Sequence, residues 1–210
     1  MIVSFERRFV YAAIPRTATH CFREALRPHL GPRDWEQCLL FNKKVFPVEP
    51  LARIGHGHIT CQQLQPFLLP GFWQEAFRFC TVRNPFDRFV SACHFAYRGT
   101  DCILQDPFGT MKRVIGEGQH RKHILFLPQH RFVSDENGRL LVDHVTKFEA
   151  LQEGFECICR RLALPAVQLT AVNGSLAPPY QTCYDSELEE MVREAYRQDF
   201  EMFGYSLHAN

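Results

Sequence analysis

The sequence has no long apolar run. Its longest unbroken stretch, Phe9 to Ile14, is six residues, whereas a helix that crosses a membrane needs about 20. We therefore expect no membrane span. We also expect no signal peptide, because Arg7 and Arg8 precede too short an apolar stretch and no small-residue cleavage site.

An excess of charge of one sign is also lacking. The 24 Lys and Arg residues nearly balance the 23 Asp and Glu residues, which leaves a net charge of +1. Without a basic field, general electrostatic binding to nucleic acid or to an anionic membrane is not expected, and any anion site must be local. The 12 glycines and 13 prolines among 210 residues exclude collagen-like and low-complexity chains. With 46% apolar residues, we expect one globular domain over residues 1–210.

Regular cysteine spacing is the third absence. The nine cysteines include no CxxC pair, and their number is odd. We interpret them as reduced thiols, most of them small packing residues, in a cytoplasmic protein.

Short apolar runs alternate with helical periodicity in the first half of the chain. Residues 9–14, 51–54 and 77–82 are predicted strands, and residues 22–30 a predicted helix that Gly31-Pro32 ends. This alternation is typical of an α/β fold with a central parallel sheet.

Further elements are predicted from capping signals. Asn84 and Pro85 begin one helix, a capping box at 146–149 begins another that Pro165 ends, and a last helix runs from about Ser186 to Gly204. We also expect a strand at 167–172 and a mobile polar excursion at 98–123.

The first strand-to-helix turn, residues 14–22, has the composition of an anion site. The N-terminus of a helix offers unpaired N–H groups at the positive end of its dipole. Arg16 adds a permanent cation, and Thr17 and Thr19 add hydroxyls. An ordinary turn with a surface arginine is the alternative.

The second such turn carries Arg83 at the end of a strand and Ser91 eight residues later. Both can face the crevice at the strand ends, where open α/β sheets bind ligands. Asn84, Pro85 and Asp87 are interpreted as helix-start residues. Arg88 is either an ion-pair partner or a second phosphate ligand.

Together the two turns resemble those of family 2 sulfotransferases, which use 3′-phosphoadenosine 5′-phosphosulfate (PAPS). Residues 16–22 match the 5′-phosphosulfate loop, residues 82–91 match the 3′-phosphate motif, and residues 148–151 and 196–205 are similar to the closing helices. The resemblance implies a three-layer fold similar to P-loop NTPases, with the two turns at opposite ends of one nucleotide. The implied nucleotide-binding residues are Arg16, Thr17, Ala18, Thr19, His20, Cys21, Arg83, Ser91, Asn173 and Ser175.

The first loop departs from the family pattern Pro-Lys-Thr-Gly-Gly-Thr-Ser. Arg16 replaces the lysine, Ala18 and Thr19 replace the glycines, and His20 and Cys21 replace the hydroxyl pair. Arginine stays protonated, so Arg16 would stabilise the leaving oxygen by its charge and would not act as an acid. Losing glycine limits how closely the backbone N–H groups can approach phosphate, although alanine and threonine are acceptable there if φ stays negative.

Among ten histidines, His56 and His58 stand out because they flank Gly57 between a predicted strand and a helix-like segment. Histidine suits a general base near neutral pH. The pair is similar to the His-Gly-His segment of uronosyl 2-O-sulfotransferases, which implies that His58 is the base and that His56 supports it. The alternatives are surface or capping histidines, or a metal site with Cys61, although the family needs no metal.

A second polar segment, residues 120–131, could hold an anionic acceptor or the adenosine, and a solvated loop is the other interpretation of it.

We expect a PAPS-dependent O-sulfotransferase that acts on a glycan or glycoconjugate hydroxyl. A non-catalytic protein that binds PAPS, its product or a glycan is the alternative. A P-loop NTPase is disfavoured because the loop lacks the GxxxxGK[ST] pattern.

Overall fold

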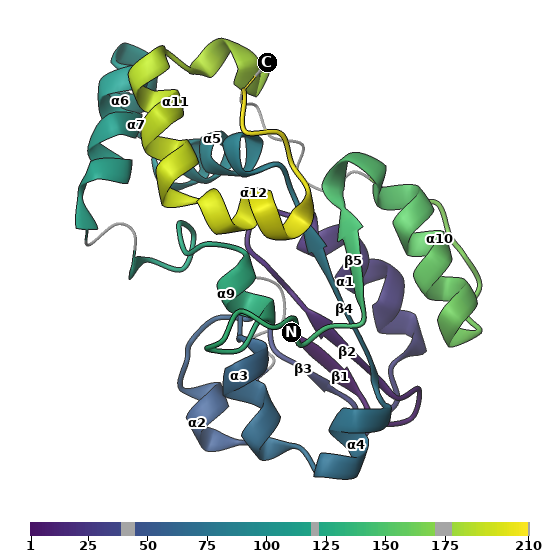
Figure 1. Ribbon diagram of the computed structural model, residues 1–210. Helices are drawn as coiled ribbons and strands as arrows, with labels where there is room; N and C mark the ends of the chain where they lie inside the picture. Colours follow the sequence, from purple (N-terminus) through teal and green to yellow (C-terminus); the bar gives the residue numbers. More distant parts are fainter. Residues whose placement is uncertain (39–44, 119–121, 171–177, 210) are drawn as a thin grey trace. The chain divides into compact units, whose positions relative to one another are not determined.

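The computed structural model describes residues 1–38, 45–118, 122–170 and 178–209 (Figure 1). Contacts divide the chain into two compact units. The first comprises Met1–Val82 and Arg131–Val172, and the second comprises Arg83–His130 and Asn173–Asn210. The single domain expected over residues 1–210 stays a prediction.

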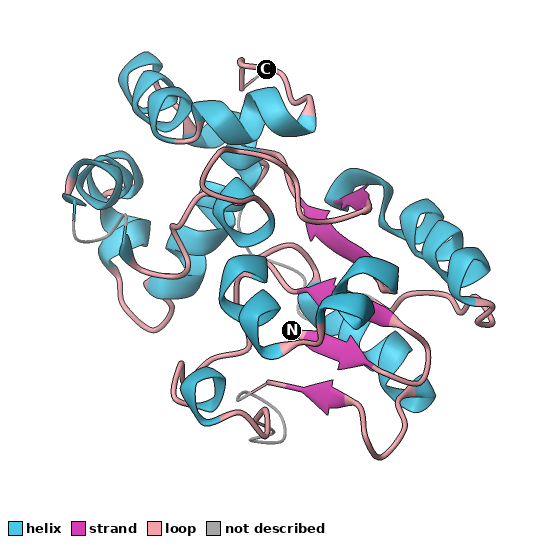
Figure 2. Ribbon diagram, turned by 60° about the horizontal axis from the view of Figure 1, so that its bottom comes forward, coloured by secondary structure: helices cyan, strands magenta, loops and turns pink. Residues whose placement is uncertain are grey.

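The first unit contains a five-stranded sheet in the order β3-β1-β2-β4-β5 (Figure 2). Its strands are β1 (Ile2–Ser4), β2 (Phe9–Ala12), β3 (Trp35–Glu36), β4 (Phe77–Val82) and β5 (His144–Lys147). β2, β4 and β5 pair in parallel, which confirms the α/β prediction, but β1 is antiparallel to both of its neighbours. A short hairpin connection joins β1 to β2, and such a connection can only join antiparallel strands.

Helices α1 (Thr19–Leu26) and α10 (Leu151–Leu162) pack on one face of this sheet. The ring of Phe22 on α1 stacks 5.5 Å from Tyr11 of β2 and meets Phe155 of α10 edge-on at 5.2 Å. All four residues of β2 are fully buried. The sheet is therefore covered on both faces at β2, as the continuous apolar run predicted.

Shorter helices follow β3 and precede β4 in the first unit. They are α2 (Glu49–Ala52), α3 (Cys61–Leu64), the 3₁₀ helix η2 (Gln65–Phe67) and α4 (Pro70–Glu75), and η1 (Arg27–His29) extends α1. The strand predicted at 51–54 is wrong, because α2 extends through Ala52 and residues 53 and 54 form a turn. Pro50 lies in its first turn, where proline favours a helix.

Two other predictions in the first unit need correction. Thr146 does not cap a helix: it lies in β5 and pairs with Thr81, and α10 begins only after the 3₁₀ helix η3 (Phe148–Ala150). No strand forms over residues 167–170, and the rest of the strand predicted at 167–172 lies outside the described residues.

The second unit is helical and has its own core. It comprises α5 (Pro85–Ala96), α6 (Cys102–Gln105), α7 (Pro107–Gly116), η4 (Tyr180–Cys183), α11 (Ser186–Ala195) and α12 (Arg197–Phe203), while α9 (His130–Val133) lies at its boundary in sequence with the first unit. Asn84 caps α5, with its side chain 2.9 Å from the N–H of Phe86, as predicted. Tyr196 interrupts the last predicted helix, which Gly204 ends in the left-handed region.

The excursion expected at 98–123 is largely wrong, because most of it forms α6 and α7. Met111, Val114 and Ile115 are buried along one side of α7. Their spacing of three and four residues is that of one helix face. The polar residues on the other faces of α7 made this apolar spacing hard to recognise in the sequence. Asp106 caps α7 by accepting from the N–H of Gly109 at 2.9 Å.

Candidate active site

The loop between β2 and α1 contains two residues in the left-handed region. Arg16 has φ 66°, and Ala18, the N-cap of α1, has φ 61°. This conformation costs an L-residue roughly 1–2 kcal/mol, whereas glycine adopts it freely. Ala18 therefore does not keep the negative φ at which alanine would be an acceptable replacement for glycine. The turn from a buried strand into α1 requires the conformation that glycine supplies in the family pattern.

Thr17 fixes this loop to the sheet. Its side chain is buried, and its hydroxyl donates to the carbonyl oxygen of Ile14 at 2.9 Å and lies 2.8 Å from the Thr81 hydroxyl of β4. The hydroxyl expected to contact phosphate is thus part of an internal hydrogen-bond network.

The first turn of α1 shares a small cavity with the two histidines. The cavity has a volume of about 60 Å³. It is lined by Thr19, His20, Arg23, Cys38, His56, Gly57 and His58. The structure thus brings part of the predicted phosphate loop and the predicted base to one place within the first unit.

His58 is held by the loop on its other side. Its Nδ1 lies 2.8 Å from the carbonyl oxygen of Ala13, which can only accept a hydrogen bond, so Nδ1 carries the proton. Burial lowers the pKa of His58 well below its usual value, and the positive charges of the Met1 amino group and Arg23 lower it further. The imidazole is therefore neutral at pH 7, with Nε2 as the proton acceptor.

His56 supports the backbone of His58. Its Nδ1 accepts the backbone N–H of His58 at 3.2 Å, and the two ring centroids are 6.0 Å apart. Burial also lowers the pKa of His20, the third histidine of the cavity, and the charges of Arg23 and Arg16 add to this effect. Three imidazoles and the Arg23 guanidinium thus line one small cavity, and the charge of Arg16 acts on His20.

Arg23 and Gln37, which no sequence motif indicated, hold the histidine segment. Arg23 is 2% exposed and donates to the carbonyl oxygens of Gln37 at 2.8 Å and of Gly57 at 3.0 Å. The side chain of Gln37 donates to the carbonyl oxygen of His56 at 2.9 Å. The position of Arg23, four residues after Thr19 on α1, is a signal that could have placed it on the same helix face.

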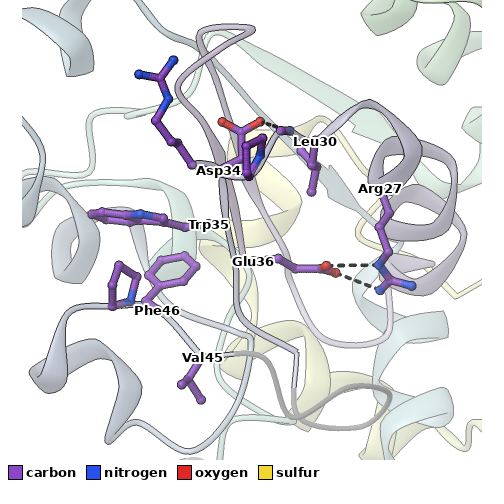
Figure 3. Close-up of a pocket in the computed structure, with 11 residues that line it drawn as sticks. Arg27, Leu30, Asp34, Trp35, Glu36, Val45 and Phe46 are labelled. Atoms are coloured by element: carbon purple, nitrogen blue, oxygen red, sulfur yellow. Dashed lines mark hydrogen bonds and ion pairs between the residues drawn. The ribbon is translucent and has the colours of Figure 1, made fainter.

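A wider cavity of about 860 Å³ lies along β3 (Figure 3). Residues 27, 30–36 and 45–47 line it. The rings of Trp35 and Phe46 are 5.5 Å apart. Glu36 accepts two hydrogen bonds from Arg27, at 2.9 and 3.1 Å, and Asp34 accepts from the N–H groups of Phe5 and Gly31. Both carboxylates are engaged in structural hydrogen bonds, so neither is a candidate acid or base.

In the second unit, Arg83 is held at both its side chain and its backbone. Its guanidinium donates to both carboxylate oxygens of Asp87, at 2.6 and 2.8 Å. Its N–H and carbonyl oxygen each bind the Gln129 amide, and Gln129 in turn donates its N–H to the buried carboxylate of Asp199 at 2.7 Å. Asp87 is thus more than a helix-start residue, and the orientation of Arg83 is set before any ligand binds.

Ser91 and Arg88 of α5 are buried, with 1% and 2% of their surface exposed. The Arg88 guanidinium donates to the carbonyl oxygens of Leu125 and Leu127, at 3.2 and 3.0 Å. Asn173 and Ser175 lie outside the described residues.

Residues 120–131 are only partly a solvated loop. Gln129 is fully buried, and His130 lies 2.6 Å from the carboxylate of Asp199. Residues 120 and 121 lie outside the described part of the chain.

The described residues contain no group of three or more His, Cys, Asp or Glu side chains that could hold a metal ion. Cys61, the third member of the alternative metal site, is fully buried.

Seven of the nine free cysteines are buried, as expected for packing residues. Among the described helices, none has the length and apolar character needed to cross a membrane.

The model of the sulfotransferase family matches residues 1–206. Searches of curated proteins and of solved structures gave no match. Because the family match extends over nearly the whole chain, this protein belongs to the sulfotransferase family.

Proposed function

We propose that this sulfotransferase uses PAPS and transfers its sulfuryl group to a hydroxyl of a glycan or glycoconjugate, with His58 as the general base. The observation that carries the proposal is a neutral imidazole, anchored through Nδ1 to Ala13, in the same cavity as the first turn of α1. Support for PAPS comes from the family, and support for a glycan comes from the His-Gly-His resemblance.

In the proposed step, Nε2 of His58 takes the proton of the acceptor hydroxyl as its oxygen forms a bond to sulfur. The bond between sulfur and the leaving phosphate oxygen breaks, and 3′,5′-diphosphoadenosine is released. As in phosphoryl transfer, positioning and charge stabilisation would supply most of the rate. Arg16 and the N–H groups at the start of α1 would stabilise the charge that develops on the leaving phosphate.

The base assignment is tested with His58→Asn, since the amide can still donate to the Ala13 carbonyl oxygen. Loss of a general base typically lowers the rate by about 10²–10⁴-fold. We expect that loss in sulfuryl transfer from labelled PAPS, with diphosphoadenosine binding by calorimetry within threefold of the parent. His208→Asn, an exposed histidine, is the matched control. Transfer by His58→Asn at the parental rate would falsify the assignment.

Arg83 and Ser91 are proposed, from the resemblance, as ligands of the 3′-phosphate. A charge-assisted hydrogen bond contributes about 1.5–3 kcal/mol, so Arg83→Ala should weaken diphosphoadenosine binding by roughly 10- to 100-fold. Adenosine 5′-phosphosulfate, which lacks the 3′-phosphate, should bind the variant and the parent alike. Equal loss of both ligands would instead indicate damage to the second unit.

The acceptor is tested with a panel of uronosyl oligosaccharides, a tyrosyl peptide and a hydrophobic alcohol. Sulfation of the oligosaccharides alone supports the glycan proposal. Sulfation of the peptide or of the hydrophobic alcohol instead would contradict a glycan acceptor. Nucleotide binding without turnover on any acceptor is the result that the non-catalytic alternative predicts. A cytoplasmic location stays a prediction.

A further inference from the structure

Arg23 is a buried cation whose partners are carbonyl oxygens. Its guanidinium lies between α1, the segment after β3 and the histidine segment, where it donates through Nη1 to Gln37 and through Nη2 to Gly57. Among the described residues, no carboxylate is paired with it, and its Nε has no hydrogen-bond partner. A buried arginine is normally paired with a carboxylate because of its desolvation cost. The arrangement therefore places an uncompensated positive charge beside the small cavity.

Gly57 lies in close contact with the Arg23 guanidinium. A Cβ at position 57 would lie 2.2 Å from the carbonyl oxygen of Gln37 and 2.6 Å from Nη2 of Arg23. Glycine is required here by close approach of the backbone. The carbonyl of Gly57 belongs to the peptide group that carries the N–H of His58, so its position determines where the His58 side chain begins.

We infer that Arg23 is a positioning residue for the proposed base: by holding the Gly57 carbonyl, it holds His58 at the cavity beside the first turn of α1. This inference rests on the proposed function. The His58 ring has one anchor at Ala13, and its backbone has the other at Arg23. Gly57 also accepts from the backbone nitrogen of Met1.

The charge of Arg23 acts on the same histidine. The groups around His58 are Arg23 and His20 from α1, His56 from its own segment, Cys38 after β3 and the Met1 amino group. The positive charge of Arg23 opposes protonation of His58, an effect that adds to burial in lowering its pKa. Arginine therefore fixes the position of the base and also keeps it ready to accept a proton.

Two variants distinguish the effect of Arg23 on the position of His58 from the effect of its charge. Arg23→Lys keeps the charge but loses the planar fork that reaches two carbonyls, and Arg23→Gln loses the charge. Arg53→Gln, whose side chain is 77% exposed, is the control. Each variant is first compared with the parent in urea unfolding, and if Arg23→Gln does not fold, Arg23→Lys carries the test.

We expect both Arg23 variants to lower kcat at least tenfold, with diphosphoadenosine binding within threefold of the parent. The acidic limb of the pH profile of kcat/KM should move to higher pH in Arg23→Gln and stay in place in Arg23→Lys. Parental kcat in both variants, or equal losses of kcat and nucleotide binding, would overturn the inference.

Titration of the His58 ring by NMR, without donor, separates this inference from the proposed function. In Arg23→Gln the pKa of His58 should rise relative to the parent, and in Arg53→Gln it should not change. If His58→Asn retains full transfer while this titration shifts, the base assignment fails and the contact between Arg23 and His58 stands. An unchanged titration in Arg23→Gln overturns the inference whatever the activity.

Discussion

Ala18 holds a backbone conformation that its side chain disfavours, directly at the N-terminus of α1. Relief of the left-handed penalty exceeds the extra entropy of glycine in the unfolded chain. We therefore expect Ala18→Gly to raise the free energy of unfolding by about 0.5 kcal/mol in urea titrations. Ala163→Gly, also at positive φ, should likewise raise the free energy of unfolding. Ala25→Gly, inside α1, should lower the free energy of unfolding by about 1 kcal/mol. Destabilisation by all three changes would contradict the assignment of strain to Ala18.

His58 links stability to pH. Its pKa in the folded protein is depressed, so the unfolded chain binds a proton more readily as pH falls below about 6.5. Its contribution to stability is therefore complete above that pH and is lost on acidification. Urea unfolding between pH 5 and 8 should show this slope, and His58→Asn should reduce it. The same slope in His58→Asn and in the parent would contradict the direction of the shift.

At the scale of elements, α7 is a packed helix and not a surface excursion. Met111 is fully buried, whereas Leu104 of α6 is 75% exposed. Met111→Ala should lower the free energy of unfolding by about 2–5 kcal/mol, and Leu104→Ala should change it by less than about 0.5 kcal/mol. Equal effects of the two changes in urea unfolding would restore the interpretation of a mobile segment.

Helix α12 holds the backbone around Arg83 through Asp199. This carboxylate is fully buried and accepts from the N–H groups of Gln129 and His130, at 2.7 and 2.8 Å. An amide at position 199 would turn a donor toward one of these N–H groups, at a cost of about 2 kcal/mol or more. Thermal or urea unfolding of Asp199→Asn should show this loss. Glu201→Gln, at an exposed position of the same helix, should not.

For the whole molecule, the near-zero net charge means that anion binding depends on local groups. A nucleotide that binds only the folded protein stabilises it by mass action. Diphosphoadenosine at 100 times its Kd should add about 2.7 kcal/mol to the free energy of unfolding. Adenosine, without phosphates, should add little at the same concentration. Equal stabilisation by both would show that the phosphates are not what the protein recognises.

Two strands, β2 and β4, were predicted correctly from the sequence, and each has four consecutive buried residues. β2 could be predicted because a continuous apolar run marks a strand that is covered on both faces. β1 and β3 are three and two residues long, too short for any periodicity. β5 has the mixed sequence His-Val-Thr-Lys and lies at the sheet edge, where exposure removes the apolar signal.

The sequence by itself determined the α/β class, the start of α5 at Asn84 and the family, because burial along a strand, capping and motif spacing are local properties. Only the tertiary structure decided that Arg23 reaches Gln37 and Gly57, which lie 14 and 34 positions away. It likewise decided that Asp199 orients Gln129, 70 positions earlier. Hydrogen bonds between distant residues form only once the fold has brought their backbones together, and no local pattern records them.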